Sequence, residues 1–261
     1  MLSTSFVPGA PNWLDLGVPD TEAAAAFYGS VFGWTHHSAG PDAGGYGMFA
    51  LDGKYVAGIG PLVDKGDRAA WNVYFHTQDA DATAKAVEQA GGTVRFQPMD
   101  VFTSGRMAGF TDPVGARFSV WQPRDHPGLG VVNEVGTLCW TELFTTDAEA
   151  AKRFYGTVFA WRTEETPVGE HMTYSVVRPA TGDDDSTQGG IMRLPADEIA
   201  QGGISEWSPY FEVADCDATV AEATRLGATM RTEVMSMEYG RFAFLRDPFG
   251  ATFAVITSVH G

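Results

Sequence analysis

An internal repeat constrains the fold of this chain more than any other feature. The segment WLDLGVPDTEAAAAFYGSVFGW (13–34) returns as WTELFTTDAEAAKRFYGTVFAW (140–161). WNVYFHTQDADATAKAVEQAGGTV (71–94) returns as WSPYFEVADCDATVAEATRLGATM (207–230), and GRMAGFTDPVGARFSVW (105–121) returns as GRFAFLRDPFGATFAVI (240–256). The chain is therefore a duplication. We expect one domain at 9–123, a linker rich in Pro and Gly at 124–135, and a second domain at 136–258.

The second copy is longer than the first. The offset between the copies grows from 127 residues (140 − 13) to 136 residues (207 − 71). The stretch TGDDDSTQ (181–188) is strongly polar and acidic. We expect the extra residues there, in a solvated loop.

Each half also repeats a pattern of strand, helix and Gly-punctuated strands. Asp20 and Asp147 precede the helical segments of the first repeat, where a carboxylate can accept from exposed N–H groups. Behind each Asp, apolar residues recur with the helical period, which predicts one buried helix face: Ala24, Phe27, Tyr28, Val31 and Phe32, and Ala151, Phe154, Tyr155, Val158 and Phe159. We predict an α+β fold of four βαβββ units.

Charge excludes some classes of partner. The 261 residues carry a formal net charge of −16, with a sequence pI near 4.6. Such a surface repels phosphate backbones and anionic lipid, so we expect neither nucleic acid nor membrane as a partner. The start MLSTSFVPGAPNW lacks the basic and apolar regions of a signal peptide, and the expected location is the cytoplasm. Two cysteines form neither a disulfide framework nor a zinc pattern.

These motifs resemble the vicinal oxygen chelate superfamily, which includes glyoxalase I, bleomycin-resistance proteins and extradiol dioxygenases. The resemblance rests on the helix ending FYxxVFxW, the DxDAT segment after a strand, and the final DPxGAxF strand. The chain is similar to duplicated two-domain glyoxalase/bleomycin-resistance-like proteins of actinobacteria, some of them labelled hydroxylases. The resemblance implies two domains, each a curved mixed sheet that forms a cup for a small molecule. In metalloenzymes of the family, one divalent cation sits in the cup.

Matched to the family, the metal-ligand positions of this chain carry unsuitable side chains. The first position is Trp13 in one half and Trp140 in the other. The later positions are Asn72 and Ser208, then Ser119 and Ala254, with no His, Asp or Glu in the fourth strand of either half. Indole offers no lone pair to a cation, and amides and hydroxyls are poor ligands for transition metals. We therefore expect no metal and no other cofactor, with one divalent ion as the alternative.

Strand alternation predicts what lines the cups instead, because residues two apart share a face. The expected ligand contacts are Trp13, Asn72, Tyr74, Ser119, Trp121, Trp140, Ser208, Tyr210 and Glu212. Asp15 and Glu142 hold equivalent inward positions, and His76 shares the face of Tyr74. A buried carboxylate can have a raised pKa and act as an acid or base, so Asp15, Glu142 and His76 are the candidate catalytic residues. A purely structural role for each remains open.

Three functions remain open at this stage. The first is a metal-independent protein that binds a flat apolar or aromatic small molecule, for sequestration, resistance or an accessory role. The second is a glyoxalase-like or dioxygenase-like enzyme, using acid–base carboxylates or a non-standard metal set that could include His171. The third is an accessory protein whose surface binds a partner. A monomer or a homodimer is compatible with four units in one chain.

Overall fold

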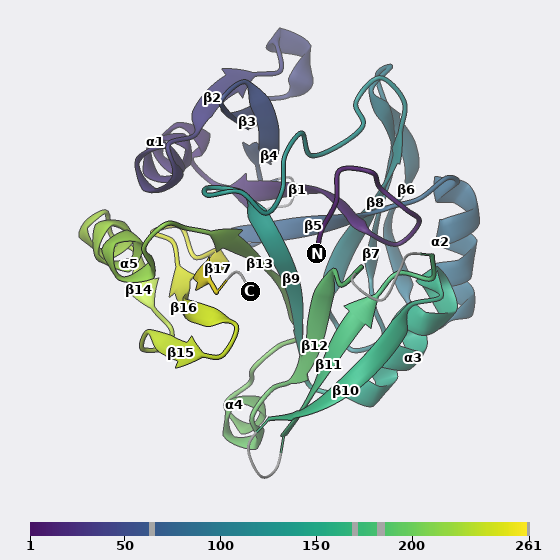
Figure 1. Ribbon diagram of the computed structural model, residues 1–261. Helices are drawn as coiled ribbons and strands as arrows, with labels where there is room; N and C mark the ends of the chain where they lie inside the picture. Colours follow the sequence, from purple (N-terminus) through teal and green to yellow (C-terminus); the bar gives the residue numbers. More distant parts are fainter. Residues whose placement is uncertain (63–65, 169–171, 182–185, 260–261) are drawn as a thin grey trace. The chain divides into compact units, whose positions relative to one another are not determined.

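The computed structural model describes residues 1–62, 66–168, 172–181 and 186–259, and Figure 1 shows the chain. His171, Gly182 and the acidic residues 183–185 lie outside the described residues. Among the described helices, none combines the length and apolar character needed to cross a membrane.

The first half of the chain contains two βαβββ units, as the repeat predicts. The first unit consists of β1 (Pro11–Val18), α1 (Thr21–Phe32), β2 (Thr35–Ser38), β3 (Gly47–Leu51) and β4 (Lys54–Pro61), with a short 3-10 turn at Pro41–Ala43. The second consists of β5 (Ala70–His76), α2 (Ala80–Gln89), β6 (Thr93–Val101), β7 (Gly105–Thr111) and β8 (Arg117–Pro123).

The second half repeats this order with additions. Its first unit consists of β9 (Leu138–Thr145), α3 (Ala148–Phe159), β10 (Arg162–Val168), β11 (Met172–Arg178) and β12 (Gly189–Arg193), followed by α4 (Ala196–Ala200). Its second unit consists of β13 (Glu206–Glu212), α5 (Cys216–Arg225), β14 (Thr229–Met230), β15 (Met235–Met237), β16 (Gly240–Arg246) and β17 (Thr252–Ser258). The predicted α+β class is therefore correct.

The extra residues of the second copy lie in more than one place. The offset is 128 between Tyr46 and Tyr174 (174 − 46), and it rises to 132 between Gly58 and Gly190 (190 − 58). This increase of four residues spans the β11–β12 connection, which contains the acidic stretch where the additions were expected. The offset then reaches 136 at Trp71 and Trp207, across the segment that forms α4. The expectation of a single insertion was incomplete.

The strands form two mixed sheets. The first sheet has the order β2-β3-β4-β1-β5-β8-β7-β6, and the second has the order β10-β11-β12-β9-β13-β17-β16-β14 with β15 paired to β16. β1 runs parallel to β4, and β9 runs parallel to β12. The hairpin neighbours are antiparallel, as in β7–β8 and β16–β17. Each half therefore contributes one complete sheet.

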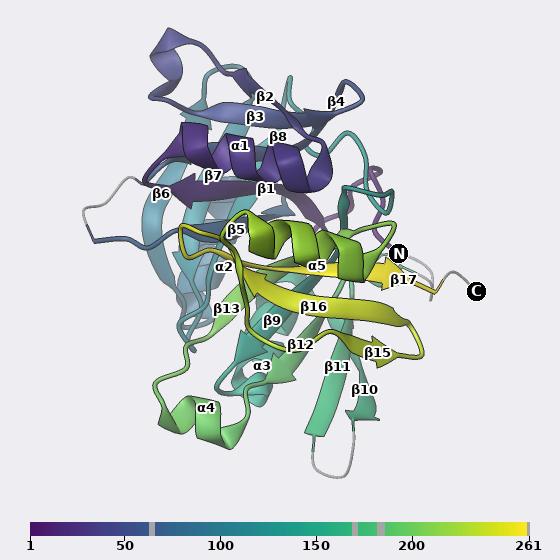
Figure 2. The same cartoon turned by 90° about the vertical axis from the view of Figure 1, so that its left-hand side faces the viewer.

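Packing divides the chain differently from the sequence repeat. One compact unit, unit 1, contains Met1–Trp13, Val73–Gly128 and Trp140–Ser208, and unit 2 contains Leu14–Asn72, Leu129–Cys139 and Pro209–Gly261. In unit 1, α2 packs against α3 (Figure 1). In unit 2, α1 packs against α5, which lies along β16 and β17 (Figure 2). Each unit thus joins one βαβββ unit of the first half to one of the second.

Local signals explain where the helices begin. The Asp20 carboxylate accepts from the Ala23 N–H at 3.0 Å, and the Asp147 carboxylate accepts from the Ala150 N–H at 2.9 Å. Both caps confirm the sequence prediction, since they satisfy N–H groups that have no partner within the helix. Most of each predicted stripe is buried: Ala24, Phe27, Tyr28 and Phe32 in α1, and Ala151, Phe154, Tyr155 and Phe159 in α3. Val31 and Val158 are only half-buried.

A buried chain of hydrogen bonds crosses the core of unit 1. The Trp207 indole donates to the Tyr155 hydroxyl at 2.9 Å, and that hydroxyl donates to the Asp112 carboxylate at 3.1 Å. The second Asp112 oxygen accepts from the backbone N–H groups of Val114 and Ala116 in the DPVGA turn. One polar chain therefore connects a helix of the second half to a turn of the first half.

Unit 2 contains the equivalent chain of hydrogen bonds. There the helix comes from the first half of the sequence and the turn from the second. The Trp71 indole donates to the Tyr28 hydroxyl at 3.1 Å, and that hydroxyl donates to Asp247 at 2.9 Å. Burial raises the pKa of both tyrosines well above the usual value, and it also raises the pKa of Asp112 and Asp247. These are desolvated polar groups, and they depend on one another for hydrogen bonds.

Candidate functional site

Side-chain alternation divides each sheet into a face covered by helices and a helix-free face. In unit 1, the helix-covered face carries Val73, Phe75, Phe118, Val120, Leu143 and Ile191. The residues between them point to the helix-free face. On the parallel strands β5 and β8, Tyr74 lies opposite Ser119 and His76 lies opposite Trp121. These four predicted site residues therefore share the helix-free face, as alternation indicated.

A linker residue covers two of the predicted ligand contacts in unit 1. The His126 ring meets Trp13 edge-on, with centroids 4.5 Å apart, and lies 5.8 Å from Trp121. The Trp121 indole donates to the His126 carbonyl at 2.9 Å. Trp13 is 4% exposed and Trp121 is 5% exposed. These indoles thus pack against the chain itself, and the sequence pattern had not indicated the part played by His126.

His76 lies at the edge of this aromatic group. Its ring stacks on Phe6 with centroids 6.4 Å apart, and its Nδ1 lies 3.4 Å from the side-chain nitrogen of Asn12. The Asn12 side-chain oxygen is buried and has no partner among the described residues. Exchanging the amide O and N of Asn12 would place an acceptor beside a protonated Nδ1. Burial lowers the pKa of His76, which favours the neutral ring.

Asp15 is the centre of a polar group in unit 2, which we call the N-terminal cluster: Asp15, Tyr46, Gly58 and Asn72. The Tyr46 hydroxyl donates to one Asp15 oxygen at 3.4 Å, and the Asn72 amide donates to the other at 3.5 Å. All three polar side chains are half-buried. Asp15 lies opposite Gly58 on the parallel strand β4. A Cβ at Gly58 would overlap the Tyr46 hydroxyl, so the glycine makes room for the ring.

Unit 1 contains the equivalent group from the second half, the C-terminal cluster: Trp140, Glu142, Tyr174, Gly190 and Ser208. Glu142 lies opposite Gly190 on β12, and a Cβ at Gly190 would overlap the Tyr174 hydroxyl. That hydroxyl accepts from the Trp140 indole at 2.8 Å. Glu142 is 3% exposed and Ser208 is 2% exposed. The Ser208 hydroxyl has no partner among the residues that the structure describes.

The remaining two predicted contacts lie in unit 2 and are held by their neighbours. The Glu212 carboxylate accepts from the Ser258 hydroxyl with one oxygen and from the Ser258 N–H at 2.9 Å with the other. Tyr210 is buried and its ring packs on Phe244, with centroids 5.5 Å apart. Glu212 therefore secures the end of β17, which is a structural use of its charge.

Sequence reasoning missed the two tyrosines of these clusters. Tyr46 lies just before β3 and Tyr174 lies in β11, outside the three segments that repeat most clearly. A signal was nevertheless present, because both fourth strands carry glycine beside the inward carboxylate, in VAGIG and GGIMR. Glycine within a strand marks a place where another group approaches closely.

The donor set does not fit the divalent ion of the family's metalloenzymes. The matched positions present two indoles, of which Trp13 is buried and Trp140 is half-buried. The others are an amide that contacts Asp15, a buried hydroxyl at Ser208, and Ser119 and Ala254 on the last strands. Across the described ranges, no three His, Cys, Asp or Glu side chains gather where they could share an ion. No chemical step is therefore derived through a metal at these residues.

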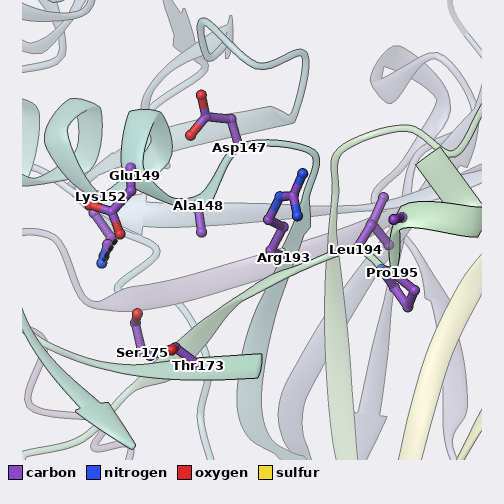
Figure 3. Close-up of a pocket in the computed structure, with 10 residues that line it drawn as sticks. Asp147, Ala148, Glu149, Lys152, Thr173, Ser175, Arg193, Leu194 and Pro195 are labelled. Carbon is purple, nitrogen blue, oxygen red and sulfur yellow. Dashed lines mark ion pairs between the residues drawn. The ribbon is translucent and has the colours of Figure 1, made fainter. Parts of the chain in front are cut away.

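A separate cavity of about 570 Å³ lies in unit 1, at the start of α3 (Figure 3). Its lining combines charges of both signs with hydroxyl groups: Asp147, Glu149, Lys152, Thr173, Ser175 and Arg193, with Ala148, Leu194, Pro195 and Ala196. Lys152 is paired with Glu149 and Glu165. None of the site residues predicted from the sequence lines this cavity.

Comparison with known protein families shows two matches. Residues 10–120 match the family described as "Glyoxalase/Bleomycin resistance protein/Dioxygenase superfamily", and residues 140–256 match "Glyoxalase-like domain". The anthracycline biosynthesis protein DauV of Streptomyces sp. (strain C5) is 40% identical over 97% of this chain and 94% of its own length. The putative glyoxylase CFP32 of Mycobacterium tuberculosis (strain CDC 1551 / Oshkosh) is 37% identical over 97% and 96%.

Solved structures share the fold at low sequence identity. The 2,2',3-trihydroxybiphenyl 1,2-dioxygenase of Sphingomonas wittichii strain RW1 aligns with a TM-score of 0.66 and 16% identity, over 97% of this chain and 91% of that one. The Mn(II)-bound glyoxalase of Novosphingobium aromaticivorans aligns with a TM-score of 0.63 and 16% identity, over 97% and 84%. At this level of identity the likeness concerns the fold alone.

Proposed function

Because the chain belongs to the glyoxalase/bleomycin resistance protein/dioxygenase superfamily, we propose that it binds a flat aromatic small molecule without using a metal ion. The observation that carries the proposal is the replacement of the family's metal ligands by indole, amide and hydroxyl groups in both halves. In place of a metal, the Asp15 carboxylate beside the Tyr46 hydroxyl supplies hydrogen bonds for orienting a ligand.

The relatives favour an aromatic ligand of several fused rings. DauV is named for anthracycline biosynthesis, and anthracyclines are fused-ring quinones with phenolic hydroxyl groups. A neutral ligand of this kind suits a protein with a net charge of −16 better than an anion does. The protein would sequester such a molecule or present it to another enzyme.

A metal-independent enzyme is the second candidate, and the N-terminal cluster favours it. A half-buried carboxylate with a phenol 3.4 Å away can take a proton from a ligand hydroxyl and return it. The putative glyoxylase among the relatives agrees with such a role. Turnover of a dicarbonyl or of a phenolic quinone, lost in Asp15→Asn, would distinguish an enzyme from a binding protein.

Metal content and ligand binding together test the primary proposal. Untagged protein is purified without chelators and analysed by plasma mass spectrometry, and 1,8-dihydroxyanthraquinone is then titrated with and without EDTA. We expect only trace metal and a saturable absorbance change that EDTA does not alter. About one equivalent of a transition metal per chain, or loss of binding in EDTA, would contradict a metal-independent function.

A further inference from the structure

The two halves build the same local arrangement of carboxylate, glycine and tyrosine. Asp15 lies opposite Gly58, and Glu142 lies opposite Gly190, on equivalent parallel strands. In both copies the tyrosine hydroxyl occupies the space where a glycine Cβ would lie. The clusters can therefore be compared position by position, each within its own unit.

The carboxylate and the hydroxyl of the C-terminal cluster are buried, whereas its Trp140 and Tyr174 are half-buried. Glu142 and Ser208 are 3% and 2% exposed, so a ligand cannot reach them unless neighbouring side chains move. The Tyr174 hydroxyl is already engaged by the Trp140 indole at 2.8 Å, which is a short, well-formed bond. The Ser208 hydroxyl has no partner among the described residues, so the cluster leaves one buried polar group unsatisfied.

The N-terminal cluster differs in exposure and in the spacing of its groups. Asp15, Tyr46 and Asn72 are all half-buried, so solvent reaches the group. The two donors stand 3.4 and 3.5 Å from the carboxylate oxygens, at the far limit of hydrogen-bond length. Functional hydrogen bonds in ligand-free sites are often long in this way, and both donors can turn to a ligand oxygen.

We propose that the N-terminal cluster is the ligand-recognition site of this protein and that the C-terminal cluster is structural. This inference rests on the proposed function and assigns it to one copy. A phenolic hydroxyl of the ligand donates to the Asp15 carboxylate and accepts from the Asn72 amide or the Tyr46 hydroxyl. A hydroxyl is both donor and acceptor, so it complements one carboxylate flanked by two donors. Tyr46 and Asn72 then determine specificity for hydroxylated aromatics.

Matched substitutions in the two copies test the proposal. The probe is 1,8-dihydroxyanthraquinone, and its 1,8-dimethoxy ether serves as the ligand that cannot donate. We expect Tyr46→Phe to weaken binding of the dihydroxy probe about tenfold, because one hydrogen bond is lost. We expect Tyr174→Phe to leave the dissociation constant within about twofold of wild type. The ether should bind wild type at least about tenfold more weakly than the probe.

A second pair of variants displaces each tyrosine without removing a polar atom. Gly58→Ala introduces a Cβ where the Tyr46 hydroxyl lies, and Gly190→Ala does the same to Tyr174. Gly58→Ala should weaken probe binding and Gly190→Ala should not, with melting temperature reporting whether each variant is folded. This pair remains informative if a tyrosine variant proves unstable.

The outcomes separate this inference from the proposed function. Wild type that binds no probe refutes binding of this ligand class, and the inference fails with it. If wild type binds the probe and binding is weakened only in Tyr174→Phe and Gly190→Ala, the proposed function stands. The assignment to the N-terminal cluster is then overturned. The assignment is overturned as well if the variants of the two clusters weaken probe binding equally, or if no variant weakens it.

Discussion

At the residue scale, Ser208 is the clearest anomaly of the second half. Its hydroxyl is buried and has no hydrogen-bond partner among the described residues, whereas the equivalent Asn72 contacts Asp15. A buried polar group without a partner is destabilising, because it has lost its hydrogen bonds to water and forms none within the protein. The position therefore carries a stability penalty that a small apolar side chain would remove.

We accordingly predict that Ser208→Ala leaves the free energy of unfolding unchanged or raises it by up to about 1 kcal/mol. Urea unfolding followed by circular dichroism measures the change. Ser205→Ala is the control, because the Ser205 hydroxyl is also buried but is bonded to Thr145 and accepts from the Thr146 N–H. That variant should lose about 1 kcal/mol. A clear loss in Ser208→Ala would mean that the hydroxyl is satisfied in solution.

Asp247 allows a prediction about pH at the same scale. Burial raises the pKa of Asp247, and the bonds from backbone N–H groups and Tyr28 offset this only in part. The folded state then holds this proton more tightly than the unfolded chain does. The contribution of the group to stability is therefore largest below the unfolded pKa, and it is lost as pH rises through the raised folded pKa.

Asp247→Asn cannot ionise, so its stability relative to wild type should improve as pH rises from about 4 to about 7. Melting temperatures of the two proteins across this range provide the measurement. A constant difference would show that the carboxylate titrates alike in the folded and unfolded states, and a difference of opposite slope would show that its folded pKa is lowered.

At the scale of secondary structure, Tyr155 joins α3 to the turn between β7 and β8. Its hydroxyl donates to Asp112 and accepts from Trp207, so its removal leaves the Trp207 indole N–H and one Asp112 oxygen without the bonds that they make to it. We predict that Tyr155→Phe lowers the free energy of unfolding by about 1–3 kcal/mol. Tyr28→Phe should show a loss of the same size, because Tyr28 makes the equivalent bonds to Asp247 and Trp71 in unit 2. A change below about 0.5 kcal/mol in both variants would contradict this account.

At the scale of the whole molecule, neither half of the sequence forms a compact unit alone. Unit 1 takes Met1–Trp13 and Val73–Gly128 from the first half and Trp140–Ser208 from the second, and unit 2 takes the remainder of both. The hydrophobic core of unit 1 likewise contains Phe75 and Phe118 of the first half beside Phe154 and Tyr155 of the second. Each half depends on the other to bury its apolar helix faces.

We therefore predict that fragments 1–134 and 135–261, expressed together as separate chains, associate and co-purify through a tag on one of them. Each fragment alone should unfold over a broader temperature range, because its helices lack their packing partners. The chain is divided between Glu134 and Val135, which are both exposed. Two fragments that melt sharply alone and do not associate would show that each sequence half is an independent domain.

The sequence by itself determined the local elements of this protein. The Asp20 and Asp147 caps, the apolar stripes of α1 and α3, and the shared face of Tyr74, His76, Ser119 and Trp121 all follow from short-range rules. Helix caps and side-chain periodicity act between residues a few positions apart, so a linear pattern contains them. The family and its α+β fold follow from the same motifs, while the domain bounds and the site roles stay predictions.

Only the tertiary structure decided which repeat of the first half packs against which repeat of the second half. Tyr155 could in principle bond to Asp112 or to Asp247, because both aspartates lie in the same DPxGA motif. The duplication makes these choices equivalent in sequence, and packing of α2 against α3 selects Asp112. The ring contact between His126 and Trp13 and the packing of Tyr46 over Gly58 are also decided by the tertiary structure. Contacts between distant segments depend on the packing of whole elements, which no local pattern specifies.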